Sequence, residues 1–184
     1  VIPETNDTQE LLSSSFHSSI HSKVEQSING FGFKIVRLQC QTPFDKIHFD
    51  AEFRLTKKEI NPFDFTPSES IASDFESLND LNFKVDFEAF LSSTTLTKLP
   101  SKHQDLFIFD TSQSIYDNLQ SLNNWAYMHI YFKVGVTQVD TLLADIIENR
   151  HGVCQDFAHL FIAIARSNNI PSRYVSGFLH QGSG

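Results

Sequence analysis

The sequence predicts an α+β chain in which a β-rich N-terminal part precedes a helical C-terminal part. Before about residue 100, apolar and polar residues alternate, as over residues 47–55, which is typical of a strand with one buried face. After residue 110, apolar residues recur every three or four positions, which is typical of an amphipathic helix. We therefore expect a β-rich domain with a connector over residues 1–100 and a second domain over residues 101–184.

The N-terminal part is expected to contain a β-hairpin. Residues 31–38 are rich in aromatic and β-branched side chains, residues 47–55 alternate, and residues 42–45 supply a turn between them. Residues 61–104 contain three prolines and many polar side chains. We interpret them as a connector, with helical turns near residues 74–81 and 87–91.

Three helices and one strand are expected in the C-terminal part. Asp110 and Gln113 resemble a capping box at the start of a helix of about five turns. Shorter helices are predicted over residues 141–149 and 153–168, and a strand over residues 173–179. The helix over 153–168 is apolar almost all round, which predicts a central, buried position. Its expected inner face comprises Phe157, Leu160, Phe161, Ile164 and Ala165.

Composition excludes several classes of function. The formal net charge of −8 disfavours nucleic acid as a partner. The chain has neither an apolar run long enough to span a membrane nor a signal peptide, so we expect a cytoplasmic protein without membrane contact. Its two cysteines and eight histidines lack the spacing of zinc ligands, so we expect no metal, and we expect no cofactor.

The chemistry is expected at residues 151–157, where Cys154 falls in the first turn of the buried helix. Unpaired N–H groups and the helix dipole favour a thiolate there, which makes Cys154 a candidate nucleophile. The backbone N–H groups of Cys154 and Gln155 are candidate donors to an oxyanion. The alternative is that Cys154 is a small core residue, as most free cysteines are and as we expect for Cys40. We interpret Asp156 as a residue favoured by the dipole rather than as a catalytic acid.

The sequence over residues 151–179 resembles the core motif of the transglutaminase-like family, which belongs to the papain-like thiol enzymes. The matching features are Gly-Val-Cys at 152–154, Ala-Arg at 165–166, Ile-Pro-Ser-Arg at 170–173 and Val-Ser-Gly at 175–177. The segment from Leu122 to Thr137 is similar to the bacterial branch. Residues 30–60 are loosely similar to a β-rich domain found beside this core. The resemblance implies a papain-like helical lobe with an antiparallel sheet.

The resemblance also implies a Cys-His-Asp triad with Cys154 as nucleophile. The family's His and Asp lie on strands after the one expected at 173–179, so we expect residues 1–184 to be an incomplete, inactive piece of an enzyme. His151, His159 and His180 are weak substitutes, for which a surface position is the default. Trp125 is expected to be a core anchor, and Arg166 and Arg173 to be surface or ion-pairing residues.

The function implied by the resemblance is that of a cysteine protease, a hydrolase, or a transglutaminase-like transferase. Such an enzyme acts on a peptide or protein substrate through a thioester on Cys154. The sequence does not choose between water and an amine as acceptor, and it gives neither the substrate nor the oligomeric state. The alternative from another class is a non-catalytic protein-binding module with the same fold.

Overall fold

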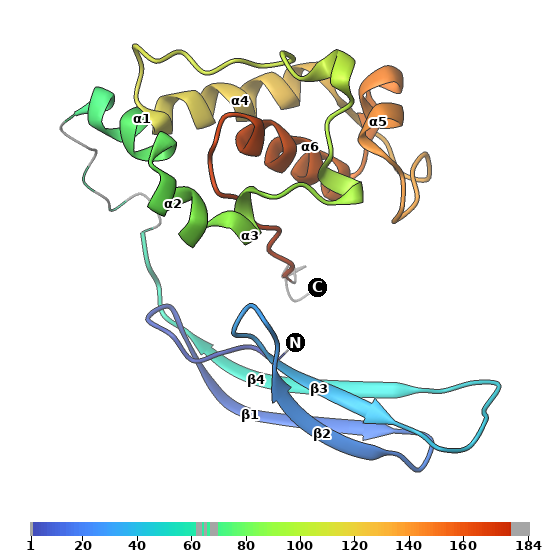
Figure 1. Ribbon diagram of the computed structural model, residues 1–184. Helices are drawn as coiled ribbons and strands as arrows, with labels where there is room; N and C mark the ends of the chain where they lie inside the picture. Colours follow the sequence, from blue (N-terminus) through green and yellow to red (C-terminus); the bar gives the residue numbers. More distant parts are fainter. Residues whose placement is uncertain (1, 62–63, 65, 67–69, 178–184) are drawn as a thin grey trace. The chain divides into compact units, whose positions relative to one another are not determined.

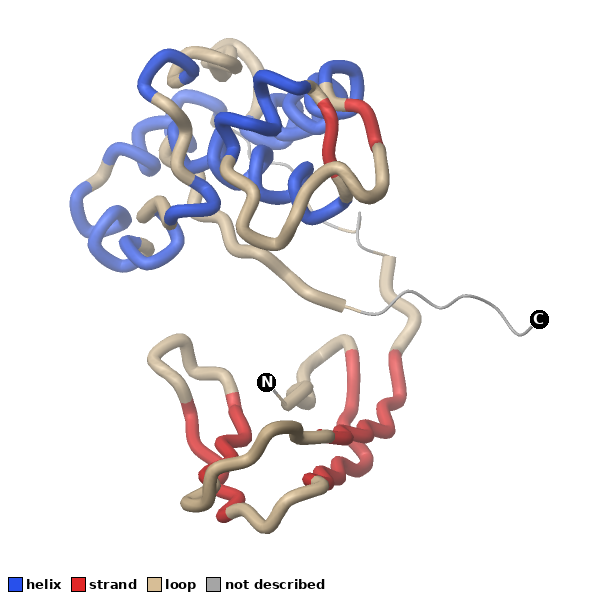
Figure 2. The backbone as a smooth tube through the Cα atoms, turned by 90° about the vertical axis from the view of Figure 1, so that its right-hand side faces the viewer, coloured by secondary structure: helices blue, strands red, loops and turns tan. Residues whose placement is uncertain are grey.

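The chain divides into two compact units, residues 1–66 and 67–184. A computed structural model describes residues 2–61, 64, 66 and 70–177 (Figure 1). Strands make up the first unit and mostly helices the second, which confirms the predicted α+β class (Figure 2). The units divide after Thr66 rather than near residue 100, because the short helices after residue 70 share a core with the C-terminal helices. Leu78 lies in the same hydrophobic cluster as Leu122 and Ile164.

The first unit contains two antiparallel two-stranded sheets. Its strands are β1 (Gln9–Ser18), β2 (Lys23–Ile28), β3 (Lys34–Gln39) and β4 (Phe49–Lys57). Strand β1 pairs with β4, and β2 pairs with β3. The predicted hairpin between the third and fourth strands is therefore wrong, although both strands exist.

A tight turn at Asn29 explains why β3 pairs with the strand before it. The Asn29 Oδ1 accepts hydrogen bonds of 3.0 Å from the backbone N–H groups of Phe31 and Phe33. Gly32 has φ +83°, a conformation that glycine adopts without strain. These residues read as strand in the sequence, but their local hydrogen bonds form the hairpin turn instead.

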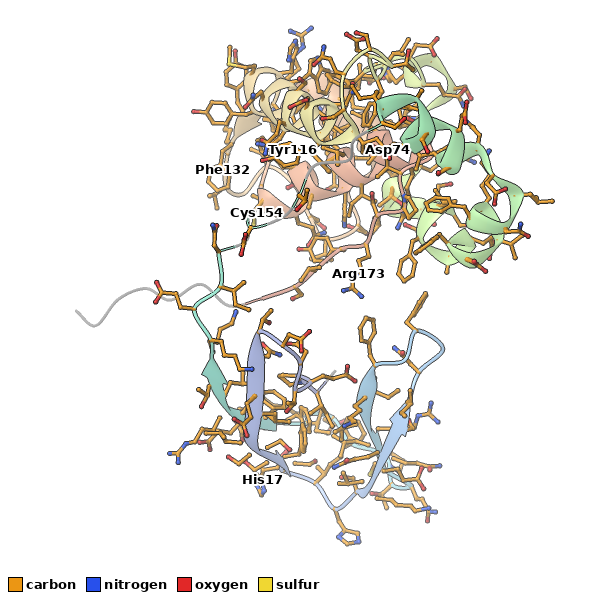
Figure 3. All side chains as sticks on the ribbon, turned by 90° about the vertical axis from the view of Figure 1, so that its left-hand side faces the viewer. His17, Asp74, Tyr116, Phe132, Cys154 and Arg173 are labelled. Carbon is orange, nitrogen blue, oxygen red and sulfur yellow. The ribbon has the colours of Figure 1, made fainter. Side chains whose placement is uncertain are left out.

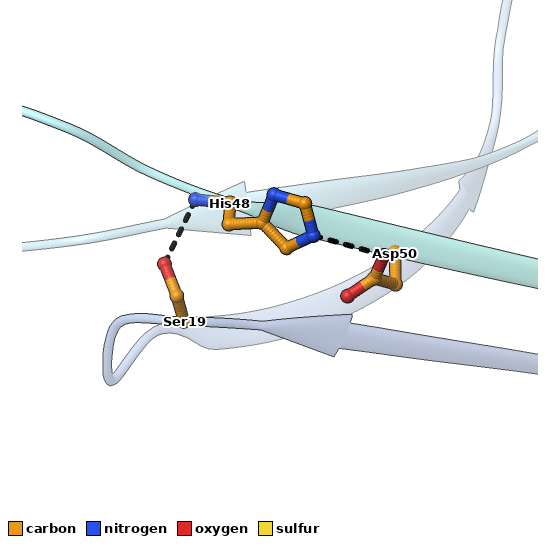
Figure 4. A network of polar contacts seen from close by, with 3 residues as sticks. All are labelled: Ser19, His48 and Asp50. Atoms are coloured by element: carbon orange, nitrogen blue, oxygen red, sulfur yellow. Dashed lines mark hydrogen bonds and ion pairs between the residues drawn. The ribbon is translucent and has the colours of Figure 1, made fainter.

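Side chains and backbone join β1 to the start of β4. The Ser19 Oγ accepts a 2.8 Å hydrogen bond from the His48 N–H, and His48 Nε2 lies 3.1 Å from Asp50 Oδ1 (Figure 4). The side chain of Phe16 contacts Phe49 and Phe53, at ring-centroid distances of 6.3 and 5.6 Å. The expected buried face of residues 47–55 is not observed, because Phe53 is only half-buried and its neighbours on the strand are exposed.

The second unit is built from helices, and α6 contributes the largest share of its core. The 3₁₀ turns η1 (Thr95–Thr97) and η2 (Ser101–His103) connect its two groups of helices. None of the described helices is long and apolar enough to cross a membrane. The remaining elements are α1 (Ile71–Asn79), α2 (Leu81–Asp86), α3 (Glu88–Leu91), α4 (Ile115–His129), β5 (Tyr131–Phe132), α5 (Leu143–Asn149), β6 (His151–Gly152) and α6 (Cys154–Ser167).

Helix α4 starts later than the sequence predicted. Its N-cap is Ser114, whose side chain accepts a 3.1 Å hydrogen bond from the Asp117 N–H. The Asp110 carboxylate instead accepts from Ser112 and from the Gln113 side chain, which makes a separate turn before the helix. The predicted capping box was thus a local turn with a similar residue pattern.

Helix α6 occupies the centre of the second unit, as predicted. Leu160 and Ile164 are fully buried, and they pack with Leu122, Leu143 and Ile146 from α4 and α5. Phe157 and Phe161 are only half-buried, so the inner face is rotated from the one expected. The strand expected over 173–179 is absent from residues 173–177, and the last two of its residues lie outside the described part.

Ile164→Ala should lower the free energy of unfolding by about 2–5 kcal/mol, because it leaves a cavity at a fully buried position. The matched control is Ile108→Ala, since Ile108 is 70% exposed and should change stability by less than about 0.5 kcal/mol. Urea unfolding measures both. Equal effects of the two substitutions would show that α6 is not central.

Candidate active site at the start of helix α6

Helix α6 begins at Cys154 because the residue before it is extended and a carboxylate caps the first turn. Val153 has φ −104° and ψ 177°. The Asp156 Oδ2 accepts a 2.8 Å hydrogen bond from the Val153 N–H. This bond satisfies a donor that lacks a partner within the helix, and the negative charge complements the positive end of the helix dipole. Cys154 is thereby fixed as the first helical residue.

Gly152 is required because the Asp156 side chain lies directly against it. A Cβ atom at residue 152 would stand 2.7 Å from both Cβ and Oδ2 of Asp156. Real Cβ atoms do not approach other atoms so closely. The Asp156 side chain is therefore the group that leaves no room for a larger residue at position 152.

A second hydrogen bond connects the Asp156 carboxylate to a loop that is distant in sequence. The Thr137 Oγ1 donates to Asp156 Oδ2 at 2.6 Å. Asp156 is only 1% exposed, and a buried carboxylate is stable only where donors replace its water. The dipole role expected for Asp156 is therefore part of a larger one, because this side chain also fixes Thr137. The sequence around Thr137 does not indicate this contact, because the two residues are 19 positions apart.

Two further contacts attach residues 133–142 to the start of α6. The Lys133 N–H donates to the Gly152 carbonyl oxygen at 2.9 Å, in register with the parallel pairing of β5 and β6. The Gln155 Nε2 donates to the Val139 carbonyl oxygen at 3.1 Å. The loop is therefore attached on both sides of Cys154, and Phe132 lies near Cys154 in Figure 3.

Cys154 itself is a free, exposed thiol. Within residues 70–177, no hydrogen bond reaches its sulfur, and the N–H groups of Cys154 and Gln155 have no acceptor. An accessible sulfur beside two unpaired N–H groups has the composition of a nucleophile with an oxyanion site. The alternative expectation of a buried structural thiol does not describe Cys154.

Neither His151 nor His159, the two candidate histidines among the described residues, forms a hydrogen bond with the Cys154 sulfur. His151 is half-buried, and its Nδ1 lies 2.8 Å from the Asn149 carbonyl oxygen. His159 is buried rather than at the surface, with its ring 5.6 Å from that of Tyr174. Burial lowers the pKa of His159, and the Asp156 charge opposes this shift. His180 lies outside the described residues.

Arg166 connects three segments, and it forms no ion pair with the residues that the structure describes. Its guanidinium donates to the carbonyl oxygens of Ser172 and Ser92, and to the hydroxyl of Thr97. These bonds fix the chain after α6 against the 3₁₀ turn η1. Trp125 packs between Phe107 and His129, at ring-centroid distances of 6.0 and 4.6 Å, as expected of a core anchor.

A cavity of about 610 Å³ runs along the side of α6 that carries Cys154. Phe157, Ala158, Phe161 and Ile162 line it, and they follow Cys154 by three, four, seven and eight positions. Residues at these spacings share one face of a helix. The described residues contain no cluster of three or more His, Cys, Asp or Glu side chains that would hold a metal ion.

Comparison with known proteins shows what the second unit is similar to. Residues 108–184 match the model of the transglutaminase-like superfamily. The match agrees with the family resemblance of residues 151–179. An uncharacterised protein of Mycobacterium leprae is 46% identical over 56 residues, which are 30% of this chain and 20% of the relative. An uncharacterised Mycobacterium tuberculosis protein is 39% identical over 61 residues, which are 33% of this chain and 19% of the relative.

A solved structure has a fold similar to that of this chain. It is described as a putative cysteine protease from Cytophaga hutchinsonii. The TM-score is 0.64 at 22% identity, and the match covers 93% of this chain and 57% of the other. The chain thus spans about a fifth of the length of the curated relatives and little more than half of this structure.

Gly152→Ala should destabilise the protein by about 1–3 kcal/mol, because the added Cβ displaces the Asp156 side chain. The matched control is Gly177→Ala, since nothing lies within 4 Å of a Cβ there. The control should be neutral or slightly stabilising. Thermal unfolding compares them, and equal melting temperatures would contradict the close packing of Gly152 on Asp156.

Cys154 should react with iodoacetamide several-fold faster than Cys40 at neutral pH, because it is exposed at a helix start. Cys40 is half-buried, with its sulfur 3.2 Å from the Thr42 carbonyl oxygen. A hydrogen bond with the Thr42 side chain lowers the pKa of Cys40, so the comparison is a demanding one. Mass spectrometry of Cys40→Ser and Cys154→Ser gives the two rates. Faster labelling of Cys40 would refute an activated Cys154.

Proposed function

We propose that Cys154 is the nucleophile of a cysteine enzyme that acts on amide or peptide bonds of a peptide or protein substrate. One observation carries the proposal, namely an exposed thiol at the first residue of a buried helix, next to unpaired N–H groups of Cys154 and Gln155. The superfamily match over residues 108–184 supports it, because the resemblance assigns the nucleophile to this position.

In the proposed reaction, a base removes the Cys154 proton and the sulfur attacks the substrate carbonyl carbon. The N–H groups of Cys154 and Gln155 donate to the resulting oxyanion. The C–N bond then breaks, the departing amine takes the proton, and a thioester with Cys154 remains. Water releases a carboxylic acid, as in a hydrolase of the cysteine protease type. A second amine instead gives a new amide, as in a transglutaminase.

The base is expected to come from outside residues 70–177, since no described histidine bonds to the Cys154 sulfur. The resemblance assigns this role to a His, oriented by an Asp, on strands that follow residues 173–179. Asp156 has a structural role instead, because its Oδ2 accepts hydrogen bonds from Val153 and Thr137. The proposal therefore describes the whole protein, of which residues 1–184 supply the nucleophile and the oxyanion donors.

Cys154→Ala should abolish turnover of a peptide ester or amide by the whole protein, whereas Cys40→Ala should leave it unchanged. Residues 1–184 alone should give one burst of product from an activated ester and then stall, because a positioned base normally contributes several orders of magnitude. Stopped-flow and steady-state measurements separate the burst from turnover. Adding a primary amine distinguishes transfer from hydrolysis by the product formed.

Persistent turnover in Cys154→Ala would refute the proposal. Sustained turnover by residues 1–184 that requires Cys154 would instead place a base within them. His180→Ala and His151→Ala would then identify it. Peptide binding without any burst in the whole protein would favour the non-catalytic binding module.

A further inference from the structure

The loop that follows α4 exposes an unusual number of large apolar side chains. Between residues 131 and 142, only Lys133 and Asp140 are charged, and their charges cancel. An exposed apolar group of this kind on a soluble protein marks a binding surface. Its members are Tyr131 (70% exposed), Phe132 (64%), Val134 (75%), Val139 (77%) and Leu142 (44%).

The loop is held in place by its polar groups, which leaves these apolar side chains outside. The Lys133 N–H donates a hydrogen bond to the Gly152 carbonyl oxygen, and the Thr137 hydroxyl donates to the Asp156 carboxylate. The Val139 carbonyl oxygen accepts a hydrogen bond from the Gln155 side chain. A hydrogen bond of 2.7 Å from the Gln138 N–H to the Thr141 hydroxyl closes a turn within the loop. A surface fixed before binding loses little entropy when a ligand contacts it, which is the property of a preorganised subsite.

The position of the loop relates it to Cys154. All three residues that hold it, Gly152, Gln155 and Asp156, lie within two positions of the thiol. A reacting carbonyl stands about 3–3.5 Å from the nucleophile, and one extended residue spans about 3.3–3.6 Å. The substrate residues next to the attacked carbonyl must therefore pass close to this loop.

We propose that residues 131–142 form a specificity subsite that takes an apolar side chain of the substrate next to the carbonyl that Cys154 attacks. This inference rests on the proposed function of Cys154. An apolar side chain gains by leaving water against Phe132, Val134 and Val139. A charged side chain finds no opposite net charge on the loop and loses hydration there. The subsite thus selects apolar over charged residues.

The test uses peptidyl chloromethyl ketones that differ only in the residue next to the ketone, namely Leu, Phe, Asp or Lys. Each alkylates Cys154 irreversibly, with chloride as the leaving group, and mass spectrometry of the full chain in its Cys40→Ser form follows the rate. The Leu and Phe reagents should react about 10- to 100-fold faster than the Asp and Lys reagents, as expected for burial of one large apolar side chain. The iodoacetamide rate corrects for the reactivity of the thiol itself.

Val139→Asp should reduce this preference about tenfold when each ketone rate is divided by the iodoacetamide rate of the same variant. The matched control is Val85→Asp, because Val85 is 66% exposed and belongs to α2. It should keep the full preference. Val139→Ser is a milder variant, which should weaken the preference in the same direction.

Equal rates for all four ketones, with normal iodoacetamide labelling, would overturn the subsite and leave the nucleophile in place. No reaction of Cys154 with any reagent would overturn the proposed function, and the subsite with it. If Val139→Asp lowered stability but kept the preference, another segment of the chain would cover the loop and the subsite would be refuted.

Discussion

The start of α6 depends on the hydrogen bonds that the Asp156 carboxylate accepts. One oxygen accepts from Val153, which sets the first helical residue, and from Thr137, which fixes a loop from another part of the chain. The same side chain packs on Gly152, where any other residue would collide with it. Because a buried carboxylate is costly without donors, the loss of one of these contacts weakens the others. Cys154 lies in the sequence between Val153 and Asp156, so the hydrogen bond between these two residues fixes its position.

The residues that hold the start of α6 in place differ from those that are proposed to react. Asp156 contacts both Thr137 and Gly152, whereas Cys154 is exposed and the N–H groups of Cys154 and Gln155 have no acceptor within residues 70–177. Arg166 has a similar supporting role at the other end of α6, where it attaches the chain after the helix to the turn at Thr97. A rigid helix with an exposed thiol at its start would hold the proposed nucleophile and oxyanion donors in fixed relative positions, which acyl transfer requires.

The sequence predicted features that depend on local pattern. The spacing of apolar residues predicted α6 and its central position, and Cys154 was predicted to lie in the first turn of this helix. Contacts between residues that lie far apart in the sequence were harder to predict. The sequence contained the strands now called β3 and β4, but not the Asn29 turn that pairs β3 with β2. Asp156 was visible as a first-turn acid, whereas its partner Thr137 lies 19 positions away and has no distinguishing neighbours. His159 was expected at the surface because its helix position does not reveal the Tyr174 ring above it.

The central claim is that Cys154 carries the acyl group. Its most direct test is to treat the protein with an activated acyl ester, quench in acid and map the adduct by tandem mass spectrometry. We expect one acyl group on the peptide that contains Cys154, and we expect neutral hydroxylamine, which cleaves thioesters, to remove it. An adduct found on Cys40, or on lysine side chains alone, would contradict a nucleophilic role for Cys154.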